Sequence, residues 1–236
     1  MKVLVVDIGG TTVKITAMNQ GTRRKFKSGP TMTARQMIAG VKILARGWKY
    51  DRISIGYPGV VKHNRPITEP HNLAGGWVNF DYTAAFGCPV KIINDAAMQA
   101  VGSYKSGTML FLGLGTGLGS ALVVDGMVVP MELAHLPYRR STYEYYLGLH
   151  GKERAGNKKW RNHVAAVVAD LMAAFRPDEV VLGGGNSKRL KKLPKACRLG
   201  DNDNAFAGGL RLWDHPQLPG IVRPAKTRAR QRGARR

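Results

Sequence analysis

The alternation of apolar and polar residues in the first hundred positions predicts short buried strands with helices between them. Residues 3–8 form an apolar run typical of a buried strand, and "VKITAMN" predicts the strand that returns after two glycines. "TRRKFKSG" predicts a third, more exposed strand. From Thr33 to Arg46 apolar residues recur at a helical period, with Thr33 placed to cap the helix. "RISIGYPG" and "VKIINDAA" predict two more strands, the second followed by a helix through Val101.

The second half of the chain repeats this pattern. "MLFLGLGTGLGSALVVDGMVV" predicts a strand, a glycine turn, a second strand, a tight turn at Asp125–Gly126 and a third strand. Helices are expected at 144–149 and 159–175, and "EVVLGGG" predicts a strand that ends in three glycines. The two strand–turn–strand openings, near residues 7 and 113, indicate two lobes that meet between Ser103 and Thr108. We therefore expect an N-terminal lobe at 1–105, a C-terminal lobe at 106–215 and a disordered basic tail at 216–236.

The composition of the chain narrows its class. With 236 residues and 44% hydrophobic content, the chain is long enough for a substantial core. No apolar run approaches the roughly 18 residues of a membrane span, and the N-terminus opens directly into a strand pattern without a signal peptide. The two cysteines exclude a disulfide framework and a four-cysteine zinc site. These features predict a cytoplasmic protein without membrane attachment.

The formal charge of +22 adds a polyanion to the expected partners. The segment "RPAKTRARQRGARR" supplies seven Lys or Arg and no acid, which leaves +15 on the rest of the chain. Nucleic acid, an anionic membrane and inorganic polyphosphate all fit such a surface. A solvated basic surface without any partner fits equally well, because charge balance alone does not name a ligand.

Two glycine-rich turns are candidate phosphate sites, because glycines let backbone N–H groups approach an anion closely. The first turn adds two hydroxyls and a cation, and its residues are Gly9, Gly10, Thr11, Thr12 and Lys14. The second has Gly115, Thr116 and Gly117 at its centre. Neither contains the GxxxxGK[ST] phosphate loop, and the second turn differs from the GxGxxG dinucleotide motif. The alternative for each turn is a tight hairpin that needs positive φ angles.

The motifs and their order resemble a known family. "DIGGTTVK", "GYPG", "IINDA", "LGLGTGLGSALVVDG", "ELAH" and "EVVLGGG" follow one another as in the ROK family of sugar kinases and repressors, over roughly residues 3–210. The resemblance implies the α/β actin-like ATPase fold, with two ribonuclease-H-like lobes and a cleft between them. Within the family the chain is most similar to the polyphosphate/ATP glucokinase branch. The resemblance also implies a homodimer and a Mg²⁺ ion held by Asp7 through water.

The resemblance assigns roles to polar residues of the cleft. It implies that Asp95 is the general base on the sugar 6-hydroxyl, and that Asn94, Glu132, His135 and Glu144 contact the sugar. The chemistry agrees, because phosphoryl transfer to an alcohol needs a carboxylate beside the attacking oxygen, and hydroxyls both donate and accept hydrogen bonds. Taken alone, Asn94–Asp95 indicates a helix N-cap, and His135 indicates a surface or satisfied core histidine.

The donor side of the site is expected at the later glycines. The resemblance implies that Gly183, Gly184 and Gly185 let the backbone approach a nucleotide. The segment after them is short for the family and strongly basic between Lys188 and Arg198, which favours polyphosphate as a donor. Many members carry a cysteine-rich zinc motif after the histidine, and this chain has none, so no zinc site is expected. Packing of Tyr143, Tyr145 and Tyr146 is expected to order that loop.

Three functions stay open at this level. The first is a sugar kinase that transfers a phosphoryl group from polyphosphate, ATP or both to the 6-hydroxyl of glucose or a close hexose. The second is a transcriptional regulator of the same family, in which a helix-turn-helix domain precedes the first glycine motif; here that motif begins at residue 7, which disfavours a regulator. DNA or RNA binding through the basic tail is a related alternative. The third is a non-catalytic sugar-binding protein.

Overall fold

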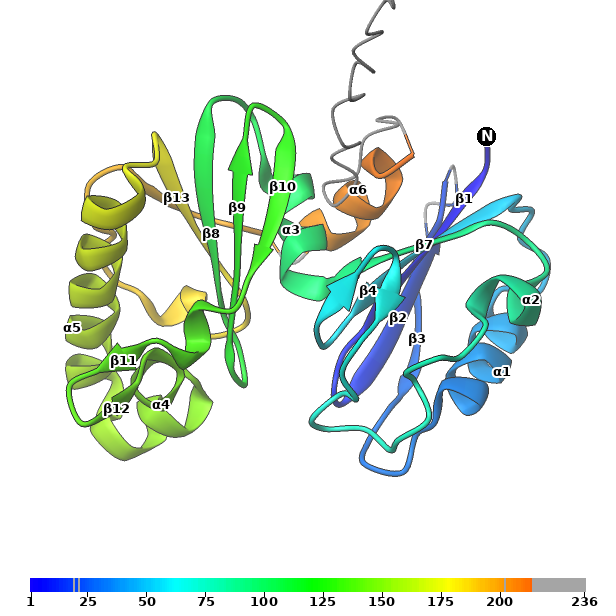
Figure 1. Cartoon of the computed structure of the whole chain (residues 1–236), viewed down its shortest axis with the longest axis horizontal. Helices are drawn as coiled ribbons and strands as arrows, with labels where there is room; N and C mark the ends of the chain where they lie inside the picture. Colours follow the sequence, from blue (N-terminus) through cyan, green and yellow to red (C-terminus); the bar gives the residue numbers. More distant parts are fainter. Residues whose placement is uncertain (19, 21, 202, 214–236) are drawn as a thin grey trace, which may run out of the picture.

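A computed structural model describes residues 1–236 except 19, 21, 202 and 214–236. Two lobes lie side by side, each built on one five-stranded sheet (Figure 1). The predicted tail at 216–236 lies outside the described residues.

The N-terminal sheet has the strand order β3-β2-β1-β4-β7. Its strands are β1 (Val3–Ile8), β2 (Thr12–Ala17), β3 (Arg24–Lys27), β4 (Arg52–Tyr57) and β7 (Val90–Asn94). The first three are joined antiparallel, whereas β1, β4 and β7 run parallel to one another. Because parallel strands end at the same edge, the ends of β1, β4 and β7 bring their last residues together.

The C-terminal sheet repeats this plan, with the strand order β10-β9-β8-β13-β14. Its strands are β8 (Thr108–Leu114), β9 (Leu118–Val124), β10 (Met127–Met131), β13 (Glu179–Gly183) and β14 (Cys197–Leu199). As in the first sheet, three strands are joined antiparallel (β8, β9 and β10), and β8, β13 and β14 run parallel to one another. The repeat confirms the duplicated opening predicted from the sequence. Two short hairpins, β5–β6 (Val61–Lys62 and Arg65–Pro66) and β11–β12 (Pro137–Tyr138 and Ser141–Thr142), complete the strands.

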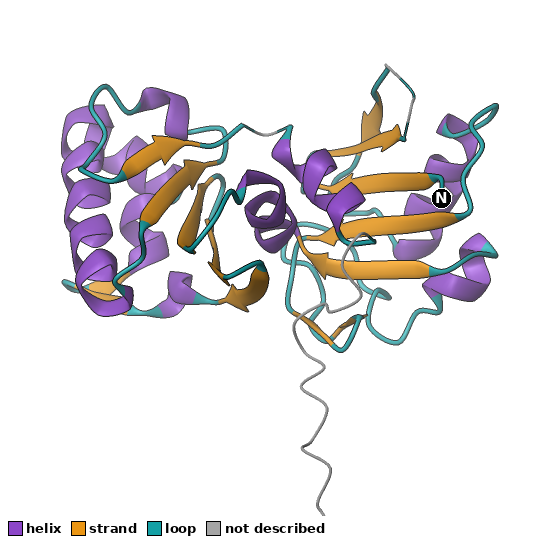
Figure 2. Cartoon of the chain, turned by 90° about the horizontal axis from the view of Figure 1, so that it is seen from above, coloured by secondary structure: helices purple, strands orange, loops and turns teal. Residues whose placement is uncertain are grey.

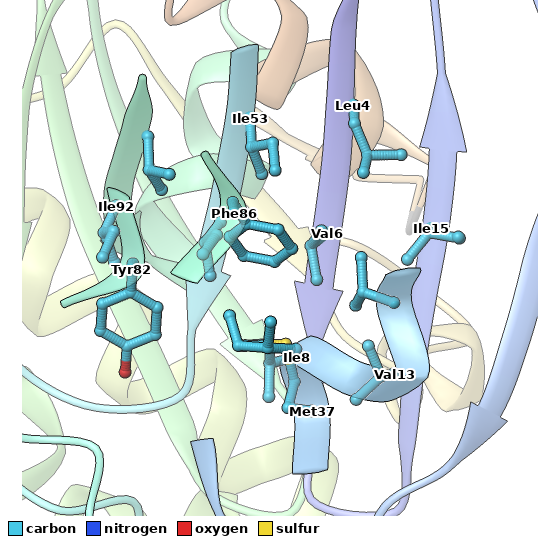
Figure 3. Packing of buried hydrophobic residues seen from close by; sticks show 14 of the residues in the cluster. Leu4, Val6, Ile8, Val13, Ile15, Met37, Ile53, Tyr82, Phe86 and Ile92 are labelled. Atoms are coloured by element: carbon cyan, nitrogen blue, oxygen red, sulfur yellow. The ribbon is translucent and has the colours of Figure 1, made fainter. Parts of the chain in front are cut away.

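Both faces of each sheet are covered, which explains why the central strands are apolar throughout. Alternate residues of β1 face the N-terminal core beneath α1 (Ala34–Leu44) and α2 (Tyr82–Phe86), as Figure 3 shows for Leu4, Val6 and Ile8. Met37 of α1 and Phe86 of α2 pack there. The predicted cap of α1 is confirmed, because the Thr33 side chain and that of Gln36 form a capping box.

In the C-terminal lobe, alternate residues of β8 face opposite partners. Leu110 and Leu112 pack with Val164 and Val168 of α5 (Leu149–Phe175), whereas Phe111 faces the helices between the lobes. The sequence predicted a helix from residue 159, whereas α5 begins ten residues earlier, at Leu149. A kink at Gly156 divides this helix. Helix α4 (Tyr143–Leu147) and the short 3₁₀ helices η1 (Leu133–His135) and η2 (Ser187–Arg189) complete the lobe.

Two helices lie between the lobes, α3 (Asp95–Ser103) and α6 (Asn204–Arg211) (Figures 1 and 2). Their residues share one core with β1 of the N-terminal sheet and with β8, β9, β10 and β13 of the C-terminal sheet. Their contact requires a glycine in each helix. A Cβ on Gly102 would lie 1.8 Å from the Asn204 carbonyl oxygen, and one on Gly208 would lie 1.8 Å from that of Met98. No described helix has the length and apolar character needed to cross a membrane.

Candidate active site

The end of the N-terminal sheet gathers the first group of predicted site residues. Asp7 pairs with Gly56 near the end of β1, and Asn94 pairs with Tyr57 at the end of β7. Helix α3 begins directly after β7, so Asp95 is its first residue. The strand ends therefore place Asp7 and Asp95 at one edge of the sheet, beside the C-terminal lobe.

Asp95 lies where carboxylates from both lobes meet. Asp95 is half-buried, and loss of water around its carboxyl group raises the pKa of Asp95 to about 7. The negative charges of Asp7 and Glu132 add to this rise, and the hydrogen bond from the Ala96 N–H to Asp95 Oδ1, at 2.7 Å, opposes it. A carboxylate with a pKa near neutrality is a much stronger base than an ordinary aspartate. The geometry therefore suits Asp95 to accept a proton.

Asn94 has a structural role that limits its proposed sugar contact. Its Oδ1 accepts a hydrogen bond from the Ala97 N–H at 3.1 Å, and so caps α3. Its Nδ2 donates to the Gly59 carbonyl oxygen at 3.2 Å. The helix-cap interpretation of this motif is thus confirmed for Asn94, and it orients Asp95 as the next residue.

Glu132 approaches Asp95 from the other lobe. Buried Ser120 fixes the corner that carries it, because the Ser120 hydroxyl donates to the Met131 carbonyl oxygen at 2.9 Å and accepts from the Leu133 N–H at 3.1 Å. Partial loss of water raises the pKa of Glu132, His135 opposes the rise, and Glu144 adds to it. The three predicted sugar contacts of the C-terminal lobe are therefore close enough to influence one another.

Glu144 lies against the second glycine turn. Its Oε2 accepts from the Leu118 N–H at 3.0 Å, and a Cβ on Gly117 would lie only 2.3 Å from the same oxygen. Glycine at 117 is therefore required for Glu144 to reach the turn. Glu144 also shares a cavity of about 290 Å³ with Thr116 and Arg154. Glu144 thus orders the turn in addition to facing Glu132.

The first turn is closed by its own hydrogen bonds. The Gly9 N–H donates to the Thr12 carbonyl oxygen at 3.0 Å, and the Ser28 hydroxyl donates to the Gly9 carbonyl oxygen at 2.6 Å. In the described part of the chain, the N–H groups of Gly10 and Thr11 have no such protein partner. These two N–H groups, together with the exposed Thr11 side chain, are the donors that the turn offers to an anion.

The second turn is joined to the later glycines by Asn186. The Gly115 N–H is shared between the carbonyl oxygens of Gly113 and Gly117, each at 3.1 Å. Asn186, directly after Gly183–Gly185, donates from Nδ2 to the Gly115 carbonyl oxygen at 2.9 Å. A Cβ on Gly115 would meet no protein atom within 4 Å. Space beside Gly115 is therefore open to a ligand.

The positive-φ explanation for these turns is wrong. Among the described glycines, those with positive φ do not include Gly9, Gly10, Gly115 or Gly117. Of the predicted donor-site glycines, only Gly184 has a positive φ, of 80°. Glycine at the two hairpin turns thus serves close approach and open space rather than a left-handed backbone.

Asp7 is the candidate metal ligand. Its carboxylate is 15% exposed and lies 3.7 Å from Lys14 Nζ, and loss of water raises the pKa of Asp7 while Lys14 lowers it. The described residues contain no group of three His, Cys, Asp or Glu that could hold a metal ion by themselves. Mg²⁺ held by one carboxylate, waters and phosphate oxygens needs no such group, so the residues fit that mode of binding.

An aromatic cluster orders the segment around Glu144. The Tyr138 ring packs against those of Tyr143 and Tyr146, with centroids 5.5 and 5.1 Å apart, and its hydroxyl lies 3.3 Å from His163 Nδ1. Tyr145 lies at the edge of the cluster: its ring packs against Tyr146 with centroids 5.1 Å apart, while it is 48% exposed beneath the Arg154 guanidinium.

The sequence analysis missed three residues that organise the site. Asn186 directly follows the triple glycine, and that position was a usable signal. No sequence signal pointed to Ser120 or Lys152, because only the fold brings these residues to the turns. The Lys152 Nζ donates to Asn186 Oδ1, and the Ser120 hydroxyl donates to the Met131 carbonyl oxygen.

Comparisons with known proteins agree with this geometry. The ROK family model matches residues 3–130, more than half of the chain. Polyphosphate glucokinase of Mycobacterium tuberculosis (strain CDC 1551 / Oshkosh) is 27% identical over 213 residues, covering 79% of this chain and 78% of the relative.

Two solved structures have the same fold. Inorganic polyphosphate/ATP-glucomannokinase from Arthrobacter sp. strain KM superposes with a TM-score of 0.78 and 25% identity, covering 91% of this chain and 99% of that one. A ROK family glucokinase from Streptomyces griseus, in complex with glucose and AMPPNP, gives 0.73 and 17% over 90% and 99% of the two chains. These similarities support a sugar kinase built on the actin-like ATPase fold. The chain belongs to the ROK family.

Proposed function

We propose that this protein transfers a phosphoryl group from polyphosphate, ATP or both to the 6-hydroxyl of glucose or a closely related hexose. The observation that carries the proposal is Asp95. Its carboxyl is half-buried at the start of α3, and its pKa is raised to about 7 by loss of water and by the carboxylates of Asp7 and Glu132. Such an environment is typical of a general base.

In the proposed reaction the sugar oxygen attacks the terminal phosphorus of the donor. The bond between that phosphorus and its bridging oxygen breaks, and the hydroxyl proton moves to Asp95. The products are the sugar 6-phosphate and a donor shortened by one phosphoryl group. Positioning and charge stabilisation account for most of the catalysis in such transfers, so the glycine turns and Lys14 matter as much as the base.

The residues around Asp7 suit a Mg²⁺ ion bound together with the donor. Asp7 would hold the ion through water, and the bound ion would neutralise charge on the phosphoryl oxygens. Lys14, 3.7 Å from the Asp7 carboxylate, supplies a second positive charge at the same turn.

The hexose assignment rests on the polar groups opposite Asp95. Glu132, His135 and Glu144 offer carboxylates and an imidazole, which pair with sugar hydroxyls. Glucose is the first choice because the relative from Mycobacterium tuberculosis is a polyphosphate glucokinase. The donor assignment follows the same relative and the glucomannokinase that is named for both donors.

A matrix of donors and sugars tests the proposal. Purified protein is incubated with long-chain polyphosphate or ATP, with glucose, mannose or N-acetylmannosamine, and with or without Mg²⁺; sugar phosphate is measured. We expect Mg²⁺-dependent glucose 6-phosphate, and its loss in Asp95→Asn. Glucose binding without product in any combination would favour the non-catalytic alternative. Specific retention of DNA at physiological salt without product would favour a regulator.

A further inference from the structure

A polyphosphate donor extends beyond the turn that holds its reacting end, and the structure shows a basic surface that begins at that turn. Asn186 connects to the turn through the Gly115 carbonyl oxygen, and its backbone N–H donates to the Leu114 carbonyl oxygen at 2.9 Å. Lys152 of α5 donates from Nζ to Asn186 Oδ1. The first cation beyond the second turn is thus fixed in place by the turn itself.

From Asn186 the surface continues over η2. Arg161 of α5 donates from Nε to the Arg189 carbonyl oxygen at 2.7 Å, so α5 holds η2 at both ends. The side chains of Lys188 and Arg189 are exposed between these two contacts. Lys158 precedes Arg161 by three residues, after the kink at Gly156, and therefore lies on the same face of the helix. We call this set the α5–η2 ridge: Lys152, Lys158, Arg161, Lys188 and Arg189.

The ridge is poor in acidic residues. Residues 183–198 contain six Lys or Arg and no Asp or Glu. Residues 149–161 contain five Lys or Arg and one acid, Glu153, which pairs with His150 at 3.2 Å. A run of cations with so few opposing charges attracts a polyanion along its whole length.

The structure also corrects the extent of the basic track expected from the sequence. Arg198 does not belong to it, because its guanidinium pairs with Glu179 at 2.7 and 2.8 Å and donates to the Ser103 carbonyl oxygen at 2.6 Å. Arg154 is held over the Tyr145 ring, 3.8 Å from its centroid. The track therefore stops short of Arg198, and Arg161 extends it from η2 onto α5.

We propose that the α5–η2 ridge binds the part of a polyphosphate chain that lies beyond the reacting phosphoryl groups. This inference rests on the proposed function, because it assumes polyphosphate as a donor. Continuity with the Gly115 turn favours a donor chain over nucleic acid, since the ridge begins where the reacting end must lie. ATP and tripolyphosphate are too short to need the ridge, and they provide the internal comparison.

The test uses the double variant K188E/R189E, which changes η2. A separate single variant, K158E, changes the α5 side of the ridge. Both side chains of η2 are exposed, and the Arg189 carbonyl oxygen that receives Arg161 belongs to the backbone, so the fold is retained. The matched control is K62E/R65E, which makes the same charge change at exposed positions of the β5–β6 hairpin. kcat/KM is measured for long-chain polyphosphate, tripolyphosphate and ATP, each with glucose, across a salt series.

We expect K188E/R189E to lower kcat/KM at least tenfold for long-chain polyphosphate and less than twofold for tripolyphosphate and ATP. Its salt dependence should become shallower by about one to two in logarithmic slope, because fewer counterions are released. K158E should act in the same direction. The proposal is overturned by an equal loss with all donors, by no loss with the long chain, or by the same loss in K62E/R65E. Binding of duplex DNA that these reversals abolish, with polyphosphate use unchanged, would assign the ridge to nucleic acid. If the parent protein uses ATP but uses neither long-chain polyphosphate nor tripolyphosphate, the polyphosphate-donor proposal and the ridge proposal both fail. The proposal of a sugar kinase is then retained.

Discussion

Replacing Asp95 with asparagine separates the catalytic role of this residue from its effect on stability. The half-buried carboxyl lies between two lobes that both bring negative charge to it. Asparagine keeps the shape but carries neither the charge nor the ability to accept the sugar proton. We therefore expect Asp95→Asn to lower kcat by about 10²–10⁴-fold while sugar binding persists. We also expect the variant to be more stable than the parent at neutral and higher pH.

The stability gain follows from the raised pKa. Below pH 3.8 both the folded and the unfolded chain hold the proton on Asp95. Between pH 3.8 and 7 the unfolded chain releases it while the folded chain retains it, so the free energy of unfolding of the parent falls as pH rises. A change from 3.8 to about 7 corresponds to at most about 4 kcal/mol, and the effect levels off above pH 7. For a chain of this size, 2–4 kcal/mol is a shift of roughly 5–15 °C in Tm.

Thermal unfolding of the two proteins from pH 4 to pH 8.5 measures this effect. The difference in Tm should be small at pH 4 and grow toward pH 8, whereas kcat of the parent should rise with an apparent pKa near 7. Asp125→Asn is the matched control, because Asp125 is an exposed turn residue and asparagine suits its φ of 48°. A Tm difference that does not change with pH, or wild-type kcat in Asp95→Asn, would refute the role given to Asp95.

Three further changes test the rest of the site. Gly115→Val places its Cβ where no protein atom lies within 4 Å, so we expect an unchanged Tm with loss of donor use; full activity would remove this turn from the donor site. Glu132→Ala should raise the sugar KM by an amount equivalent to about 1–3 kcal/mol with little change in the donor KM, and an unchanged sugar KM would misplace the pocket. Asn186→Ala breaks the link to the Gly115 carbonyl oxygen and should raise the donor KM by an amount equivalent to about 1 kcal/mol, whereas an equal rise in the sugar KM would indicate general disruption.

The strand pattern of both lobes was readable from the sequence because it is local. Apolar runs bounded by glycine turns gave β1, β2, β8 and β9, and a helical period with a capping threonine gave α1. The same reading left out α6 and the first ten residues of α5. Both segments contain glycines, which disfavour a helix locally; α6 packs closely against α3 at Gly208, and the start of α5 is divided from the rest by the kink at Gly156.

The sequence by itself determined which groups are candidates for the chemistry: the carboxylates of Asp7, Asp95, Glu132 and Glu144 and the two glycine turns. Only the tertiary structure decided what each group does. Asn94 caps a helix, Arg198 forms an ion pair with Glu179, and Glu144 packs against the turn at Gly117. A pKa of about 7 for Asp95 likewise has no local cause, because it requires loss of water between the lobes and charges 88 residues upstream and 37 residues downstream. Desolvation and Coulomb interactions depend on distance in space, and the chain sets those distances only when the two sheets close around α3 and α6.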